Sequence, residues 1–190
     1  MSITVKNIRK SYGPETVLTD VSFTAPEGAV TCIMAPSGRG KTTLLRLLLG
    51  LEKPDGGSIT LPHNCRWSAV FQEDRLLEQL DGSGNLRFVL GSSYDEAEAA
   101  ALLAELDLSD VGTKLVREYS GGMKRRLALA RALLADFDAL VLDEPFTGLD
   151  LESRERCLGA IRRRMGNRPV LLVTHDEADA RGLEAHIIRL

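Results

Sequence analysis

Short apolar segments alternate with longer amphipathic segments along most of the chain. Nearly continuous apolar runs predict strands buried on both faces of a sheet, and they lie at 29–34, 68–71, 139–142, 170–173 and 187–188. Helical spacing with acidic starts or capping residues predicts helices at 41–49, 95–106, 120–134 and 152–165. Buried strands that alternate with helices predict an α/β fold around a mainly parallel central sheet.

The N-terminal part departs from this alternation. Apolar positions within 3–8 and 17–23 predict two strands joined by a turn at Gly13-Pro14, and a third strand is expected at 58–61. Because such short strands follow one another closely, we expect an antiparallel β subdomain here. The stretch 80–85, which contains two glycines, is interpreted as a loop.

One domain is expected to cover residues 1–190, with a small helical subdomain within roughly 80–135. The sequence carries no repeat, low-complexity tract or linker that would divide it. The 190 residues are 44% hydrophobic and 27% charged, which is ordinary for a globular domain. The net charge of -3 argues against a general nucleic-acid binder, whose footprint would be basic.

Cysteine usage and hydropathy set the expected compartment. Cys32, Cys65 and Cys157 lack metal-ligand spacing and are interpreted as buried or incidental thiols in a reducing compartment. The first residues do not read as a signal peptide, and no apolar run approaches the ~20 residues of a membrane span. A role at a membrane would therefore require a partner.

The stretch 35–43 reads APSGRGKTT and lies between an expected strand and an expected helix. It matches the phosphate-binding pattern G-x-x-x-x-G-K-[ST] except at its first position, Ala35. Backbone N–H groups and the helix N-terminus would hold a polyphosphate, Lys41 would reach the β- and γ-phosphates, and Thr42 would bind Mg²⁺. The alternative is a glycine-rich turn before a core helix. Ala35 would cost ~1–2 kcal/mol only if its backbone had to be left-handed.

Two further segments carry candidate chemistry. ALVLDEP places Asp143 and Glu144 at the carboxyl end of a buried strand, where open α/β sheets bind ligands. Asp143 is suited to hold Mg²⁺ and Glu144 to orient or deprotonate a water molecule, although a solvated turn is the alternative. YSGGM places Ser120 and two glycines at a helix start, which makes a second anion site or a simple capped helix.

The order of these motifs resembles the ATP-binding cassette (ABC) subunit of ABC transporters, over essentially the whole chain. The matching segments are SYG with Tyr12 (A-loop), APSGRGKTT (Walker A), VFQEDRLL with Gln72 (Q-loop), YSGGM (signature), VLDEP (Walker B and catalytic glutamate), FTGLD ending at Asp150 (D-loop) and LLVTHDEAD with His175 (switch histidine). Tyr and Met replace the usual Leu and Gln of the signature. The resemblance implies a P-loop NTPase core with the two subdomains described above.

The resemblance also implies ATP and Mg²⁺ as ligands and assigns the site. The catalytic residues would be Glu144, His175, Lys41 and Gln72. The nucleotide would contact Tyr12, Val17, Ser37, Gly38, Arg39, Gly40, Lys41, Thr42, Thr43, Ser120, Gly121, Gly122 and Asp150. The Mg²⁺ ligands would be Thr42, Gln72 and Asp143.

The same resemblance implies partners and location. Two cassettes would pack head to tail, so that Ser120, Gly121 and Gly122 of one close on the ATP of the other, and the complete motif set in one chain favours a homodimer. Separate permease subunits would span the membrane, and the chain would be cytoplasmic and peripheral on its inner face. FQEDRLL and SGGMKRR look most like importers of the nitrate, sulfonate and taurine group. The stretch 81–85 lacks the usual T-V-x-E-N-V pattern and keeps only its Asn.

Two other functions fit a cassette of this kind. One is an ATPase in a non-transport assembly, and the other is a regulatory cassette that binds ATP without hydrolysis. No heptad run appears, as DNA-end members would require, and the chain has one cassette rather than two. The catalytic set is intact, which argues against the regulatory role. The arginines of the 152–165 helix are interpreted as a solvated face rather than a docking site.

Overall fold

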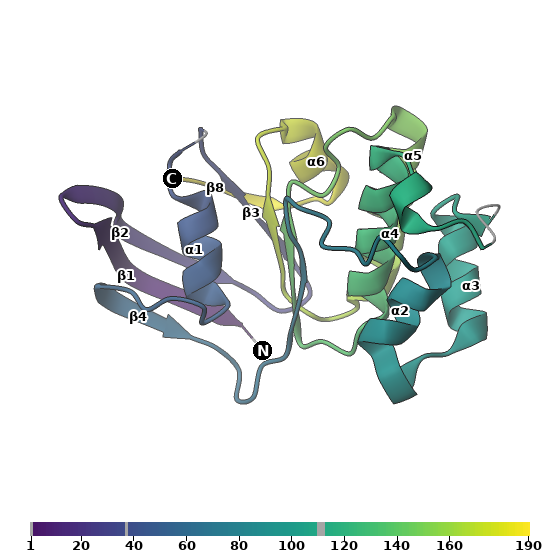
Figure 1. Ribbon diagram of the computed structural model, residues 1–190. Helices are drawn as coiled ribbons and strands as arrows, with labels where there is room; N and C mark the ends of the chain where they lie inside the picture. Colours follow the sequence, from purple (N-terminus) through teal and green to yellow (C-terminus); the bar gives the residue numbers. More distant parts are fainter. Residues whose placement is uncertain (1, 37, 110–112) are drawn as a thin grey trace. The chain divides into compact units, whose positions relative to one another are not determined.

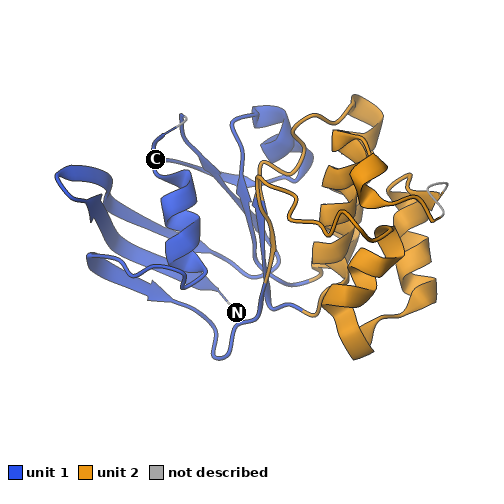
Figure 2. Cartoon of the chain, in the orientation of Figure 1, with its two compact units in different colours: residues 1–67, 137–142, 167–190 blue, residues 68–136, 143–166 orange. Residues whose placement is uncertain are grey.

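The computed structural model describes residues 2–36, 38–109 and 113–190 (Figure 1). The chain forms two compact units, which Figure 2 shows in different colours. Unit 1 comprises residues 1–67, 137–142 and 167–190, and unit 2 comprises residues 68–136 and 143–166. The single ABC domain expected over 1–190, with a helical subdomain at roughly 80–135, stays a prediction.

Unit 1 contains an antiparallel sheet built from the N-terminal part of the chain. Its strands are β1 (Ile3–Tyr12), β2 (Glu15–Ala25) and β4 (Gly56–Thr60), in the order β2-β1-β4. Both neighbours pair antiparallel with β1, which confirms the predicted N-terminal subdomain. Ile3, Val5 and Ile8 of β1 are buried, so one side of this sheet forms part of the core.

The second sheet has five strands in the order β5-β6-β7-β3-β8. They are β3 (Val30–Met34), β5 (Trp67–Val70), β6 (Ala139–Asp143), β7 (Val170–Val173) and β8 (His186–Arg189). The strand β3 is parallel to both of its neighbours, β7 and β8, and every residue of β3, β6 and β7 is buried. This confirms the predicted α/β fold with a mainly parallel sheet.

Parallel pairing decides where the ends of the unit 1 strands lie. Since β3 and β7 run in the same direction, their carboxyl ends meet at one edge of the sheet. The loop that starts at Ala35 follows β3 and leads into α1 (Lys41–Leu48). Thr174 follows β7 and leads into the short helix α6 (Glu177–Gly182). The phosphate loop and the loop of His175 therefore leave the sheet at the same edge.

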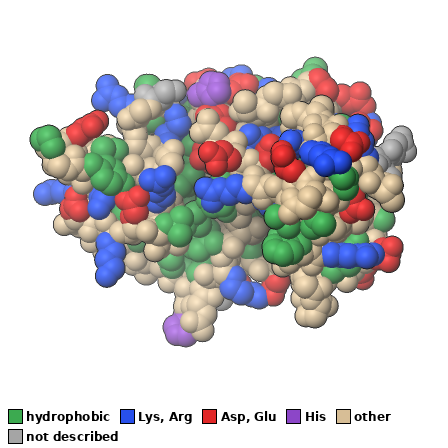
Figure 3. Space-filling view, viewed as in Figure 1, with side chains coloured by type: hydrophobic (Ala, Val, Ile, Leu, Met, Phe, Trp, Pro, Cys, Tyr) green, Lys and Arg blue, Asp and Glu red, His purple; other side chains and the backbone are tan. Residues whose placement is uncertain are grey.

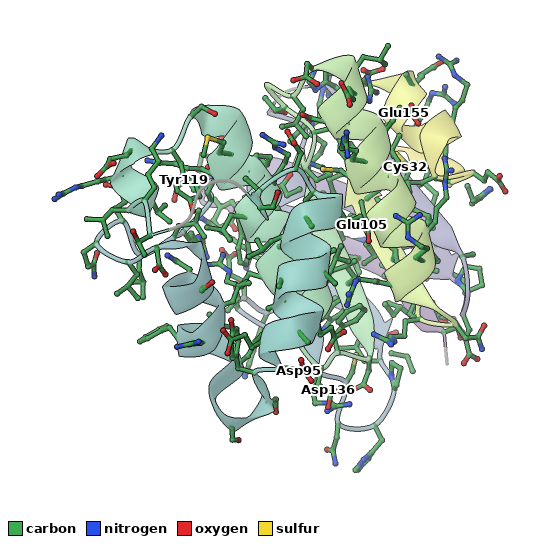
Figure 4. All side chains as sticks on the ribbon, turned by 90° about the vertical axis from the view of Figure 1, so that its right-hand side faces the viewer. Cys32, Asp95, Glu105, Tyr119, Asp136 and Glu155 are labelled. Atoms are coloured by element: carbon green, nitrogen blue, oxygen red, sulfur yellow. The ribbon has the colours of Figure 1, made fainter. Side chains whose placement is uncertain are left out.

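Unit 2 is mainly helical. Its helices are α2 (Gly82–Leu90), α3 (Glu96–Glu105), α4 (Gly121–Leu134) and α5 (Leu151–Met165), with short 3₁₀ turns η1 (Gly91–Ser93) and η3 (Val116–Glu118). Arg163 and Arg164 of α5 pair with Glu105 and Glu98 of α3, the latter at 2.8 Å. Figure 4 shows Glu105 on α3 beside α5. Part of the expected solvated arginine face is therefore used in ion pairs within the unit.

The expected loop at 80–85 is wrong, because α2 begins within it at Gly82. Asp81 is the N-cap of this helix, and its carboxylate accepts a hydrogen bond from the Gly84 N–H at 2.6 Å. Asn85 is buried and its amide bonds to the backbone of Leu77 and Asp81. Capping and a buried amide stabilise the first turn and offset the helix cost of two glycines, ~1 kcal/mol each.

Surface charge follows the balanced composition. Lys and Arg side chains are interspersed with Asp and Glu over the face that Figure 3 shows. Among the described residues, no helix has both the length and the apolar character that crossing a membrane would require.

Replacement of Asn85 by Ala should lower the free energy of unfolding by about 1–3 kcal/mol, because the part-buried Leu77 N–H would lose its acceptor, whereas the Leu77 and Asp81 carbonyl groups keep backbone partners. Urea unfolding followed by circular dichroism measures this change. The exposed Gln79→Ala in the same region is the control and should change stability by less than about 0.5 kcal/mol. Equal midpoints for both variants would contradict the role given to Asn85.

Candidate nucleotide site

The loop between β3 and α1 has the backbone geometry of an anion site. Gly40 precedes α1 with φ of 81°, and no side chain among the described residues caps this helix. The first N–H groups of a helix lack partners within the helix, and they attract negative charge. The uncapped N-terminus of α1 is thus suited to a phosphate group. Ser37 lies outside the described residues.

Close contact with β2 imposes a second requirement on Gly40. A Cβ atom at Gly40 would lie 2.6 Å from a methyl carbon of Leu18 and 3.0 Å from the carbonyl oxygen of Val17. Space and φ therefore both require glycine at this position. The contact brings together Val17 and Gly40, two of the predicted site residues. Gly38 also has positive φ, 80°, but a Cβ there would meet nothing within 4 Å.

Ala35, the one departure from the phosphate-loop pattern, does not have positive φ. Its side chain is buried at the end of β3. An alanine with an ordinary backbone conformation costs little relative to glycine, since the penalty arises only in the left-handed region. The structure thus explains why the first position of the loop tolerates alanine.

Lys41 is turned back over the loop. Its Nζ donates a hydrogen bond to the carbonyl oxygen of Ala35 at 2.6 Å, and Pro36 lies nearby with its oxygen at 3.4 Å. This places a positive charge next to the start of the loop, where it can meet phosphate oxygens. Thr42 is exposed and Thr43 is half-buried in the first turn of α1, and Arg39 is exposed on the loop.

The predicted switch histidine lies beside this loop within unit 1. His175 lines a cavity of about 330 Å³ together with Ala35, Pro36, Glu177 and Arg189. The preceding residue, Thr174, is buried, and its hydroxyl donates to the Asp179 carboxylate at 2.7 Å. This hydrogen bond fixes the loop after β7, so that His175 faces the start of the phosphate loop. Sequence reasoning missed Glu177 and Arg189, which form an ion pair at 3.1 Å.

Tyr12 ends β1 with its ring partly open to solvent. Its phenol hydrogen-bonds to the carboxylate of Glu52, and this bond is the main cause that lowers the pKa of Glu52. Lys10 places its ammonium 5.4 Å from the ring centre. A held aromatic ring with 43% of its surface exposed can stack against a flat base.

The acidic strand end lies in unit 2. Asp143 is the last residue of β6 and is buried, whereas Glu144 is half-buried and has φ of 48°. A glutamate rarely adopts this left-handed conformation, because its Cβ approaches the backbone. Such backbone strain is concentrated at functional sites. The left-handed residue interrupts the extended backbone directly after the strand.

The signature segment and the D-loop are both in unit 2. Ser120 caps α4 by accepting from the Met123 N–H at 3.2 Å. A Cβ at Gly122 would lie 3.5 Å from a methyl carbon of Leu149, so the signature glycine is close to the residue before Asp150. Asp150 caps α5 through the Ser153 N–H at 2.8 Å, which is the largest cause that lowers the Asp150 pKa.

Tyr119 replaces the usual first residue of the signature and belongs to the core of unit 2 (Figure 4). Burial raises the pKa of its phenol. A Cβ at Gly82 would lie 3.0 Å from the Tyr119 hydroxyl oxygen, so the ring reaches the first residue of α2. The substitution therefore adds a packing contact inside the unit and leaves the adjacent Ser120 exposed.

The segment after β5, which contains Gln72, is held by α4. The Gln72 side chain is exposed, while its carbonyl oxygen accepts a hydrogen bond from Arg125 at 2.6 Å. The sequence showed only a basic start of the helix and gave no sign that Arg125 is buried. The sequence shows how many residues separate Arg125 from the signature glycines, but it does not show that Arg125 is directed toward Gln72.

The candidate metal ligands are oxygen donors on separate segments. Among the described residues, no group of three or more His, Cys, Asp or Glu side chains forms a metal cluster. The Thr42 hydroxyl, the Asp143 carboxylate and the Gln72 amide instead supply single oxygen atoms. Mg²⁺ prefers oxygen ligands and binds through few protein groups plus phosphate and water, so this donor set fits it.

Comparison with known proteins agrees with these features. A sequence model described as ABC transporter matches residues 18–147. An aliphatic sulfonates import ATP-binding protein from Corynebacterium glutamicum is 40% identical and covers 98% of this chain and 79% of its own length. A second, from Nocardia farcinica, is 39% identical and covers 100% and 78%. A solved ATP-binding subunit of an ABC transporter is 25% identical, covers 100% and 86%, and has a TM-score of 0.87.

The chain therefore belongs to the ABC transporter family. ATP-binding subunits of this family hydrolyse ATP to drive transport. The alternatives of a non-transport assembly ATPase or a regulatory cassette are not favoured by these relatives.

Two substitutions in the phosphate loop should behave in opposite ways. Ala35→Gly should leave the ATP dissociation constant within about twofold, because residue 35 does not have positive φ. Gly40→Ala should weaken ATP binding by about tenfold or more, because the left-handed backbone alone costs ~1–2 kcal/mol for an L-residue. Titration with a fluorescent ATP analogue measures both constants. A large gain in affinity from Ala35→Gly would show that the alanine damages the loop.

Proposed function

We propose that this chain is the ATPase of a solute importer of the sulfonate type. The observation that carries the proposal is its similarity to relatives described as aliphatic sulfonates import ATP-binding proteins, at 40% and 39% identity over nearly the whole chain. The segments FQEDRLL and SGGMKRR favour the same group. The transported solute would be selected by the permease and binding subunits, with this chain supplying the energy.

ATP binds along the edge where β3 ends. The α1 N–H groups, with Gly38 and Gly40, hold the phosphates, and Lys41 exchanges its bond with the Ala35 carbonyl for phosphate oxygens. The adenine stacks on Tyr12, beside Val17. The remaining contacts come from Ser37, Arg39, Thr42 and Thr43.

The residues proposed for hydrolysis are those that the family motifs assign. Thr42, Asp143 and Gln72 would hold Mg²⁺. The ion would neutralise negative charge on the phosphate oxygens. Glu144, which directly follows β6, takes the proton of the attacking water or orients it. His175 contacts the terminal phosphate from the cavity next to Pro36.

The active form is a dimer of two such chains. Ser120, Gly121 and Gly122 of one chain close on the ATP bound to the partner chain, and Asp150 supports this contact as the cap of α5. The exposed Ser120 side chain and the exposed backbone of Gly121 are suited to bind a phosphate. The dimer binds transmembrane permease subunits and is located in the cytoplasm on the inner face of the membrane. No nucleic acid is involved.

The shared site predicts a specific dependence on protein concentration. Steady-state hydrolysis with Mg²⁺ should rise with more than the first power of protein concentration at low concentration, because each site needs a second chain. Glu144→Gln should abolish hydrolysis and retain an ATP-dependent dimer, measured by size-exclusion chromatography with light scattering. Strictly proportional activity from a monomer that never dimerises would contradict the shared site.

Import of sulfonates is tested in cells. Deletion of the coding sequence should abolish uptake of a radiolabelled alkanesulfonate, and restoration with the wild-type chain should recover it. Restoration with Glu144→Gln should fail, since uptake requires hydrolysis. Uptake of labelled sulfate in the same cells is the control and should remain. Unchanged sulfonate uptake after deletion would overturn the sulfonate assignment while the ATPase activity stood.

A further inference from the structure

Two arginines of α4 hold the backbone of the segment that carries Gln72. Arg125 donates to the carbonyl oxygens of Phe71 and Gln72 at 2.7 and 2.6 Å. Arg131 donates to the carbonyl oxygens of Arg75 and Asp74 at 2.6 and 2.9 Å. Four carbonyl groups within 71–75 thus accept hydrogen bonds from two guanidinium groups of one helix. Such a segment cannot move without α4 unless these charge-assisted bonds break.

Arg125 is placed where a cation would otherwise be unfavourable. It is only 8% exposed, and the nearby Asp74 carboxylate lies 3.2 Å from its guanidinium. Burial raises the pKa of Asp74, and the charge of Arg125 opposes this shift. Burying a charge is costly unless it is paired and hydrogen-bonded, so both the acid and the carbonyl groups are needed to retain Arg125 here.

The fork shape of arginine is essential for this contact. Separate nitrogen atoms of one guanidinium bond to the carbonyl oxygens of consecutive residues, Phe71 and Gln72. A lysine ammonium is a single point on a flexible stem and does not present two fixed donors to two such oxygens. The contact therefore fixes the direction of the backbone at Gln72 as well as its distance from α4.

The same helix carries the signature residues at its start. Ser120 caps α4, and Arg125 lies three residues after Gly122, ~4.5 Å further along the axis. Less than one helical turn separates Gly122 from Arg125. A displacement of the signature therefore moves Arg125, and with it the Gln72 backbone that Arg125 holds. No flexible segment intervenes between the residues that would meet the partner's ATP and the group that holds Gln72.

We propose that Arg125 is a positioning residue that ties the Gln72 backbone to the signature helix. The inference rests on the proposed roles of Gln72 and of the signature. Arg125 bonds to the backbone of Phe71 and Gln72 and acts through Gln72, whose side-chain oxygen it would keep in place for Mg²⁺.

The test compares three variants in the full chain. Arg125→Met should raise the Mg²⁺ concentration for half-maximal hydrolysis by about tenfold, as losses of groups that orient a metal ligand do. ATP affinity measured in EDTA should stay within about twofold, because the hydrogen bonds of Arg125 go to the Gln72 segment. Arg125→Lys should give an intermediate shift, since one of the two carbonyl bonds can be kept.

Arg126→Met is the matched control. Arg126 is the next residue of α4 and is similarly buried at 9% exposure. It bonds to Leu106, to Asp107 and, at 3.4 Å, to the Gly122 carbonyl oxygen within α4, rather than to the Gln72 segment. Its loss should lower stability but leave the Mg²⁺ midpoint unchanged. If Arg125→Met and Arg126→Met raised the Mg²⁺ midpoint equally, the shift would reflect a general loss of stability, and the positioning role would be overturned.

Hydrogen exchange of backbone amides gives a readout that does not depend on activity. Arg125→Met should accelerate exchange within 72–75, and Arg126→Met should accelerate it near residue 107. An inactive wild-type chain would refute the proposed function, and the exchange data would still decide whether Arg125 holds the segment. An active wild type with an unchanged Mg²⁺ midpoint or unchanged exchange in Arg125→Met would overturn the inference alone.

Discussion

The left-handed backbone at Gly40 is the constraint on which the nucleotide site depends. It allows the chain to leave β3 and enter α1 with no capping side chain, so that the first N–H groups of the helix remain for an anion. It also lets the loop pass close to Val17 and Leu18 of β2, where a Cβ would collide. The parallel pairing of β3 with β7 then places His175 beside the same loop.

Unit 2 depends on a different interaction, the pairing of buried guanidinium groups with backbone carbonyl oxygens. Arg125 and Arg131 hold the segment after β5, and Arg126 holds the turn after α3. Each of these bonds links an irregular segment to the regular helix α4. A buried cation that lost its carbonyl partners would destabilise the unit, so the irregular segments are as constrained as the helix itself.

The sequence predicted the parts of the fold that follow from local pattern. The buried strands at 139–143 and 170–173 are continuous apolar runs, and the helix at 121–134 follows a visible serine cap. The two glycines of 80–85 indicate a loop, whereas the helix that begins there depends on the cap at Asp81 and on the buried amide of Asn85, and burial of a polar side chain leaves no local trace in the sequence. The burial of Arg125 was missed for the same reason. The cost of Ala35 depends on its backbone φ, which a sequence does not show, and in the structure this φ is not positive.

The central claim is that the signature of a second chain completes the binding site for a phosphate held at the N-terminus of α1. A crystal structure of the Glu144→Gln variant with Mg²⁺ and ATP tests it most directly. The account predicts a head-to-tail dimer with Ser120 and Gly122 of one chain at hydrogen-bonding distance from the terminal phosphate held by Gly40 and Lys41 of the other. ATP bound elsewhere, or bound in a monomer with the signature exposed to solvent, would contradict it.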